Sequence, residues 1–126
     1  MSDSIDDMFD RIGEAALRRV VNGFYRRVPA DPVLGPMYPP DDMAGAENRL
    51  YGFLAQRLGG PEDYSNERGH PRLRMRHIPF AIDETARDHW ITLMGAAIDE
   101  AELPASDAEL LRHFLFSVAH SMQNRP

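Results

Sequence analysis

Four stretches of this 126-residue chain space their apolar residues three and four positions apart, and none shows sustained alternation with a period of two. The first spacing is typical of a helix that buries one face, and the second is typical of a half-buried strand. The four stretches predict helices over about residues 12–28, 43–58, 83–101 and 106–122. We therefore expect an all-α fold, and the length suits a single domain over residues 1–126.

Signals for helix ends accompany three of these stretches. Asp83 has a side chain that can cap the third helix. Ser106 and Glu109 have the spacing of a capping box at the start of the fourth. Gly59, Gly60 and Pro61 follow the second helix, and they predict that it ends there because glycine permits a turn and proline cannot continue a helix.

Prolines and glycines cut the middle of the chain into short pieces. Five prolines between Pro29 and Pro40 block regular helix, so we expect a rigid, partly buried connector of turns there. A segment over residues 71–78 has room for two helical turns before Pro79. A plain bundle would join its helices by short loops, so this organisation favours a scaffold built around a flat cofactor.

Composition excludes several classes of protein. The chain has no cysteine, which rules out disulfides, zinc–thiolate sites, iron–sulfur clusters and thiol nucleophiles. Its net charge of -6 argues against a nucleic-acid partner. No apolar run approaches the roughly 20 residues that span a bilayer, and the N-terminus lacks the features of a secretory signal. We expect a cytoplasmic protein without membrane insertion.

Histidines are the candidate metal ligands, at positions 70, 77, 89, 113 and 120. His89 follows two charged residues and is expected to be solvated. His113 and His120 lie seven positions apart instead of one helical turn, so packing or surface roles are expected for both. His77 stands beside arginines and before an apolar run, where an imidazole can ligate haem iron and guanidinium groups can meet propionates. The alternative for His77 is a solvated, arginine-rich helix end.

Five segments, spread over nearly the whole chain, form a specific combination. They are RIGEAALRRVVNGFYRRV, LGPMYPPDDMAGAENRL, LGGPEDYS, RGHPRLRMRHIPF and the tryptophan of DHWITLM. With these segments the sequence resembles the group II truncated haemoglobins, a bacterial and plant branch of the globins. One departure is that Gly13 stands alone where the family usually has two adjacent glycines. We expect this to affect the junction of the first two helices and to leave the pocket unchanged.

The resemblance implies a truncated globin fold, with helices packed two over two around one haem b. It implies that His77 holds the iron on the proximal side and that Tyr25, Tyr38 and the hallmark tryptophan, Trp90, lie on the distal side. Ala46 stands where many globins have a distal histidine. Further expected cofactor contacts are Leu50, Phe53, Tyr64, Arg68, Arg74, Met75, Arg76 and Phe80.

The distal residues suit a gas ligand. Bound dioxygen carries partial negative charge, which hydrogen bonds from Tyr25, Tyr38 or Trp90 would stabilise by about 1–3 kcal/mol each. Without the resemblance, ordinary core packing on the helical stripes would be the favoured explanation of Tyr25 and Trp90. The expected function is reversible binding of dioxygen, or of carbon monoxide or nitric oxide, for supply or storage.

Three alternatives stay open from the sequence. The same pocket suits an enzyme that turns over peroxide or nitric oxide, a haem-based sensor, or a haem-free interaction module on a globin scaffold. A reductase partner also stays open, as does the choice between a monomer and a homodimer.

Overall fold

The computed structural model describes residues 4–61 and 82–123, and every regular element within these two stretches is a helix. The α-helices are α1 (Met8–Arg27), α2 (Met43–Arg57), α5 (Glu84–Ala101) and α6 (Ala105–Met122). The short 3-10 helices are η1 (Ile5–Asp7), η2 (Val28–Ala30) and η3 (Gly35–Met37). The expected all-α class is confirmed. The helix expected over residues 71–78 lies outside the described residues.

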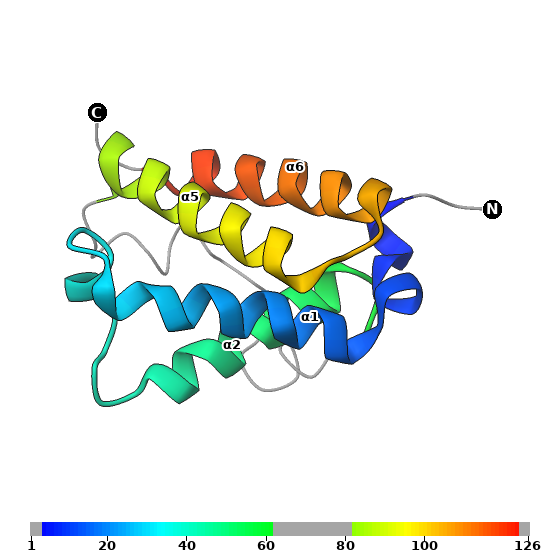
Figure 1. Ribbon diagram of the computed structural model, residues 1–126, viewed down its shortest axis with the longest axis horizontal. Coiled ribbons are helices and arrows are strands. Elements are labelled where there is room, and N and C mark those ends of the chain that lie inside the picture. The colour runs from blue at the N-terminus through cyan, green and yellow to red at the C-terminus, as the bar shows by residue number, and fades with distance from the viewer. Residues whose placement is uncertain (1–3, 62–81, 124–126) are drawn as a thin grey trace.

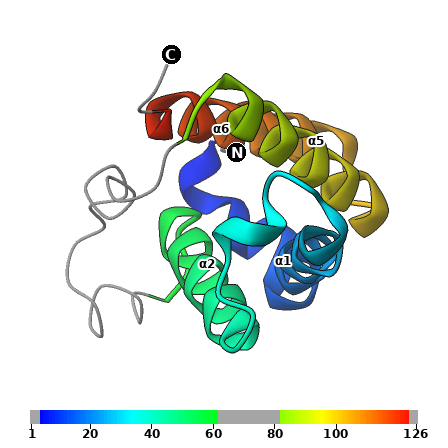
Figure 2. The same ribbon diagram turned by 90° about the vertical axis from the view of Figure 1, so that its left-hand side faces the viewer.

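The four α-helices pack as two layers of two. Helices α1 and α2 form one layer, and α5 and α6 form the other, as the end-on view in Figure 2 shows. Helix α1 contacts both α2 and α5, so it lies at the centre of the molecule (Figure 1). This is the two-over-two arrangement that the resemblance to truncated haemoglobins implies.

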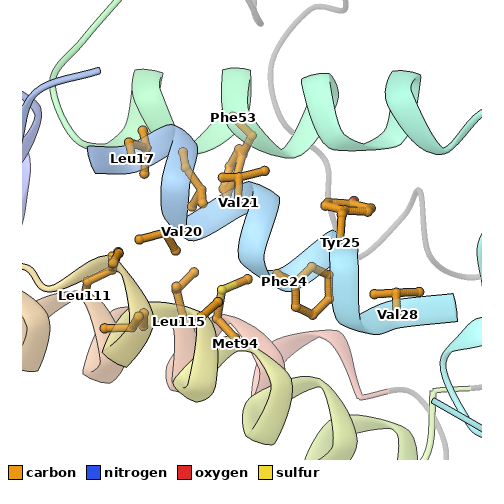
Figure 3. Close-up of a cluster of buried hydrophobic side chains, with 14 of the residues drawn as sticks. Leu17, Val20, Val21, Phe24, Tyr25, Val28, Phe53, Met94, Leu111 and Leu115 are labelled. Carbon is orange, nitrogen blue, oxygen red and sulfur yellow. The ribbon is translucent and has the colours of Figure 1, made fainter. Parts of the chain in front are cut away.

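Helix α1 is apolar on two faces, which explains its central place. Its fully buried side chains include Leu17, Val20, Val21 and Phe24. Figure 3 shows Tyr25 directed toward α2, whereas Phe24 is directed toward Met94 of α5. Burying a large apolar side chain contributes about 1.5–3 kcal/mol, so apolar burial is the main force that holds α1 between its neighbours.

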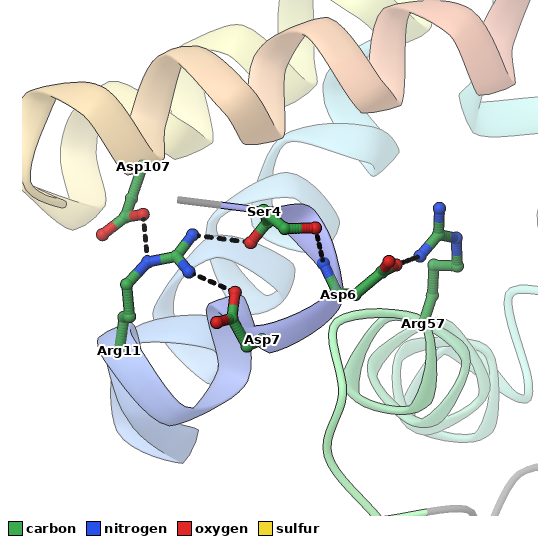
Figure 4. Close-up of polar contacts among 6 residues, drawn as sticks. All are labelled: Ser4, Asp6, Asp7, Arg11, Arg57 and Asp107. Carbon is green, nitrogen blue, oxygen red and sulfur yellow. Dashed lines mark hydrogen bonds and ion pairs between the residues drawn. The ribbon is translucent and has the colours of Figure 1, made fainter. Parts of the chain in front are cut away.

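A polar network joins the start of α1 to both layers (Figure 4). Arg11 donates to the carboxylate of Asp107 over 2.9 Å and also pairs with Asp7. Asp107 is the buried charged residue in the part of the chain that the structure describes, and it lies in the first turn of α6, where a carboxylate is favoured by the helix dipole. On the α2 side, Arg57 pairs with Asp6 over 2.6 Å.

The connector between α1 and α2 consists of turns, as its prolines predict. It contains the single helical turns η2 and η3, and its backbone folds tightly enough to bury Leu34. Tyr38 immediately follows η3 and packs against the core. The connector is therefore built of turns and partly buried, as we expected.

The predicted helix ends are mostly confirmed. The Asp83 carboxylate accepts a hydrogen bond from the Ala86 amide over 2.8 Å and caps α5. The capping box at Ser106 is wrong, because α6 begins at Ala105 after Pro104 and its start has no side-chain cap. Ser106 already lies inside the first turn, where its hydroxyl cannot act as the cap.

Two glycines adopt backbone angles that other residues avoid. Gly13 has φ 85° and ψ 165°, and it breaks α1 near its start. This explains why the helix begins at Met8 although the apolar stripe predicted a start near residue 12. Gly59 has φ 92° and ends α2 beside η1, as predicted from its sequence position.

Replacing Gly59 with alanine is expected to destabilise the protein more than replacing Gly13. Both positions carry the backbone strain of a positive φ, which costs about 1–3 kcal/mol for a residue with a side chain. At Gly59 the new Cβ would also lie 2.0 Å from the carbonyl oxygen of Asp6, whereas at Gly13 it would meet nothing within 4 Å. Urea unfolding of the two variants measures the difference, and equal losses would contradict the steric argument.

Candidate functional site

Four aromatic side chains gather where α1, the connector and α5 meet. The ring centroid of Phe24 lies 5.1 Å from that of Tyr25, 6.2 Å from that of Tyr38 and 5.6 Å from that of Trp90. The rings of Tyr25 and Tyr38 meet edge to face, with centroids 5.6 Å apart. The three residues expected on the distal side are thus brought together around Phe24. We call these four residues the aromatic cluster.

Phe24 was not among the expected site residues. Its neighbour Tyr25 was, and both belong to the apolar stripe of the first helix. The stripe indicates burial but does not distinguish a ring that packs only on the core from one that also supports a site.

The Tyr25 hydroxyl forms a hydrogen bond with α2. It donates a hydrogen bond over 3.1 Å to the carbonyl oxygen of Ala46, and the side chain is buried. Burial, followed by the neighbouring Tyr38, raises the pKa of the Tyr25 phenol well above its ordinary value. Tyr25 therefore keeps its proton and joins α1 to Ala46, the small residue at the position where many globins place a histidine.

Tyr38 and Trp90 form the other polar pair of the cluster. Burial raises the pKa of Tyr38 to about 12, although a hydrogen bond from Trp90 acts in the opposite direction. An indole N–H can only donate, so the Tyr38 oxygen accepts this bond and its own hydrogen stays available. Within residues 4–61 and 82–123 no acceptor is recorded for that hydrogen. Tyr38 can therefore act as a hydrogen-bond donor in this cluster.

Helix α2 supplies the apolar residues expected near the cofactor. Ala46, Leu50 and Phe53 recur at helical spacing along α2, with Ala46 and Phe53 buried and Leu50 half-buried. Figure 3 shows Phe53 beside Val21 of α1, which places it in the core. The other expected contacts lie outside the described residues: His77, Tyr64, Arg68, Arg74, Met75, Arg76 and Phe80.

The remaining histidines divide into two kinds. His113 and His120 are exposed on α6, which agrees with the surface alternative of the packing or surface roles expected for them. His89 was expected to be solvated, and its side chain is 35% exposed, but the sequence did not predict its contact with the connector. Its Nδ1 lies 2.9 Å from a carboxylate oxygen of Asp31, because the connector folds back against α5.

The described side chains fit the distal side of a haem. Tyr38, Leu50 and Trp90 pack against the core but are only partly buried, so they offer apolar and aromatic surface to a flat apolar group. The phenolic hydrogen of Tyr38 can donate one hydrogen bond among these mostly apolar side chains. A single donor of this kind suits a small polar ligand. Among the described helices, none is long and apolar enough to cross a membrane.

The two-over-two helices and this aromatic cluster are the features of a truncated globin. A model of the bacterial-like globin family matches residues 7–124, and the chain belongs to that family. It is 38% identical over 125 residues to group 2 truncated hemoglobin YjbI of Bacillus subtilis, covering 99% of this chain and 94% of the relative. The resemblance to group II truncated haemoglobins is thereby confirmed.

Solved structures agree in fold. A thermostable hemoglobin from Thermobifida fusca superposes with a TM-score of 0.87 at 50% identity, over 90% of this chain and 93% of that one. A truncated oxygen-avid haemoglobin from Bacillus subtilis superposes with a TM-score of 0.87 at 39% identity, over 92% of this chain and 98% of that one.

Membership of the globins assigns this chain a haem cofactor and binding of small gaseous ligands such as oxygen. Haem-based oxygen binding is therefore its function, and the comparisons do not favour the enzyme and sensor alternatives.

Proposed function

We propose that this protein binds dioxygen at a haem b that His77 ligates, and that Tyr38 is the donor that retains the gas. The observation that carries the assignment of Tyr38 is its phenolic hydrogen, which is uncommitted among the described residues while Trp90 donates to the same hydroxyl. Haem iron supplies the coordination position at which dioxygen binds reversibly.

The pocket residues act by hydrogen bonding and by excluding water. Dioxygen held in the pocket carries partial negative charge, and a hydrogen bond to a charged group contributes about 1.5–3 kcal/mol. The bond that the Tyr38 oxygen accepts from Trp90 orients the hydroxyl and strengthens it as a donor, because linked hydrogen bonds polarise one another. Tyr25 does not have this role, because its phenolic hydrogen is already bonded to the carbonyl oxygen of Ala46.

Other proposed contacts complete the cofactor site. Leu50, with the small Ala46, borders the distal space, and Phe53 supports it from the core. Met75 and Phe80 cover the porphyrin, while Tyr64, Arg68, Arg74 and Arg76 serve its propionates. We place the activity in the cytoplasm, in a monomer or homodimer, with a reductase as the partner that returns the iron to the ferrous state.

Replacing Tyr38 with phenylalanine is expected to speed oxygen release about 10- to 100-fold, which corresponds to the loss of one hydrogen bond to a charged group. The measurement is stopped-flow dissociation of oxygen from the hemin-loaded, reduced protein. A Soret band on loading is the accompanying test of the cofactor, and its absence would contradict the proposal.

Tyr25→Phe is the matched control, because it removes the same atom from a neighbouring ring. Its expected effect is on stability, about 0.5–1.5 kcal/mol for the loss of one buried hydrogen bond, because the Ala46 carbonyl keeps its helical partner within α2; we expect a smaller change in oxygen release. Faster release in Tyr25→Phe than in Tyr38→Phe would assign the donor role to Tyr25 instead.

A further inference from the structure

His89 directly precedes Trp90 on α5 and is bound to the connector. Its Nδ1 lies 2.9 Å and 3.1 Å from the two carboxylate oxygens of Asp31, a residue 58 positions earlier in the chain. The Asp31 side chain is only 10% exposed and that of His89 is 35% exposed. The contact therefore joins the beginning of the connector to the residue beside Trp90, in a partly buried place.

The same carboxylate organises the connector. Its Oδ1 accepts hydrogen bonds from the backbone amides of Val33 and Leu34, over 2.9 Å and 2.8 Å. The Asp31 carbonyl oxygen accepts from the Gly35 amide over 2.9 Å, and the Gly35 carbonyl oxygen accepts from the Tyr38 amide over 3.3 Å. A continuous series of hydrogen bonds thus runs from Asp31 to Tyr38.

We propose that Asp31 and His89 are a positioning pair that fixes Tyr38 of the connector and Trp90 of α5 relative to each other. One end of the pair fixes the turns that carry Tyr38, and the other end fixes the part of α5 that carries Trp90. The pair therefore sets the geometry of the Tyr38–Trp90 hydrogen bond. Its effect on ligand release rests on the proposed function, whereas its effect on that hydrogen bond does not.

Neighbouring charges do not substitute for this contact. Arg26 and Arg27 of α1 pair with Glu100, and Arg87 pairs with Asp88. Among the described residues, His89 is the side chain that contacts the Asp31 carboxylate. With a hydrogen on Nδ1, the imidazole donates to the carboxylate whether or not its other nitrogen is protonated.

The Asp31 side chain acts as a carboxylate in this arrangement. Burial would raise the pKa of Asp31, but the hydrogen bonds from the Leu34 amide, from His89 and from the Val33 amide outweigh it and hold the pKa below its usual value. A carboxylate can accept all three bonds at once, which a carboxamide cannot do in the same geometry.

The test compares His89→Leu with His89→Asn. Asparagine can place an N–H close to the position of the imidazole Nδ1, so it keeps the bond to Asp31, whereas leucine removes it. The readout is the ultraviolet resonance Raman signal of the indole N–H hydrogen bond, recorded on the protein as purified. Trp90 is the only tryptophan of the chain, so the signal has one source.

We expect His89→Leu to weaken the indole hydrogen-bond signal and to speed oxygen release about three- to tenfold, and His89→Asn to restore both. His113→Leu, at an exposed histidine of α6, is expected to change neither. An unchanged indole signal in His89→Leu would overturn the proposal, as would His89→Asn behaving like leucine. A changed indole signal with unchanged oxygen release would support the positioning pair and count against Tyr38 as the oxygen-retaining donor.

Discussion

We expect Phe24→Ala to lower the free energy of unfolding by about 3–5 kcal/mol, the range typical of truncating a fully buried phenylalanine. Phe24 is 0% exposed, and its ring contacts three other aromatic rings. Alanine would leave a cavity at the junction of α1, the connector and α5, and these elements cannot close it without disturbing the Tyr38–Trp90 pair. Denaturant unfolding followed by circular dichroism measures the loss.

The matched control is Phe116→Ala. Phe116 is 47% exposed on α6, so the same truncation removes little buried surface and should change stability by no more than about 0.5 kcal/mol. Similar losses in the two variants would contradict the assignment of Phe24 to the core. A lower slope of the unfolding curve in Phe24→Ala would instead indicate a more compact unfolded state or a third state.

His77→Ala is expected to abolish the normal spectrum of the haem-loaded protein. Removing the imidazole takes away the proposed bond between the chain and the iron, so the Soret band should shift and the cofactor should be lost on gel filtration. Free imidazole added to the variant should occupy the vacated position and restore the spectrum in part. Absorption spectra of the ferrous and ferric forms report both effects.

Two histidine controls make this experiment specific. His113→Ala alters an exposed residue of α6 and should leave the spectrum unchanged. His70→Ala alters the other histidine of the RGHPRLRMRHIPF segment and should also retain the haem. If His70→Ala loses the spectrum and His77→Ala keeps it, the proximal role belongs to His70.

Helix positions were the most predictable part of this fold. The apolar stripes predicted helices over residues 43–58 and 83–101, and the structure has Met43–Arg57 and Glu84–Ala101. The prediction succeeded because burial of one helical face imposes a short-range period that survives in the sequence. It missed the helical residues of α1 before Gly13 and the way α6 is capped, because Gly13 and Pro104 act on the backbone without altering the apolar period.

The site was predictable only in part. Tyr25, Tyr38 and Trp90 were expected together because of the family resemblance, and they meet in the aromatic cluster. The direction of their hydrogen bonds was not predictable, since three donors of similar strength compete for few acceptors. His89 was interpreted as solvated because its sequence neighbours are charged, and Asp31 lies 58 positions away.

By itself, the amino-acid sequence determined the helical class, the stretches that form helices and the residue types available to a haem pocket. These properties depend on local periodicity and on side-chain chemistry, which neighbouring residues encode. The tertiary structure alone decided which groups form hydrogen bonds: Tyr25 with the carbonyl of Ala46, Trp90 with Tyr38, and His89 with Asp31. Each of these bonds joins distant segments, and its partner is selected by how the helices pack.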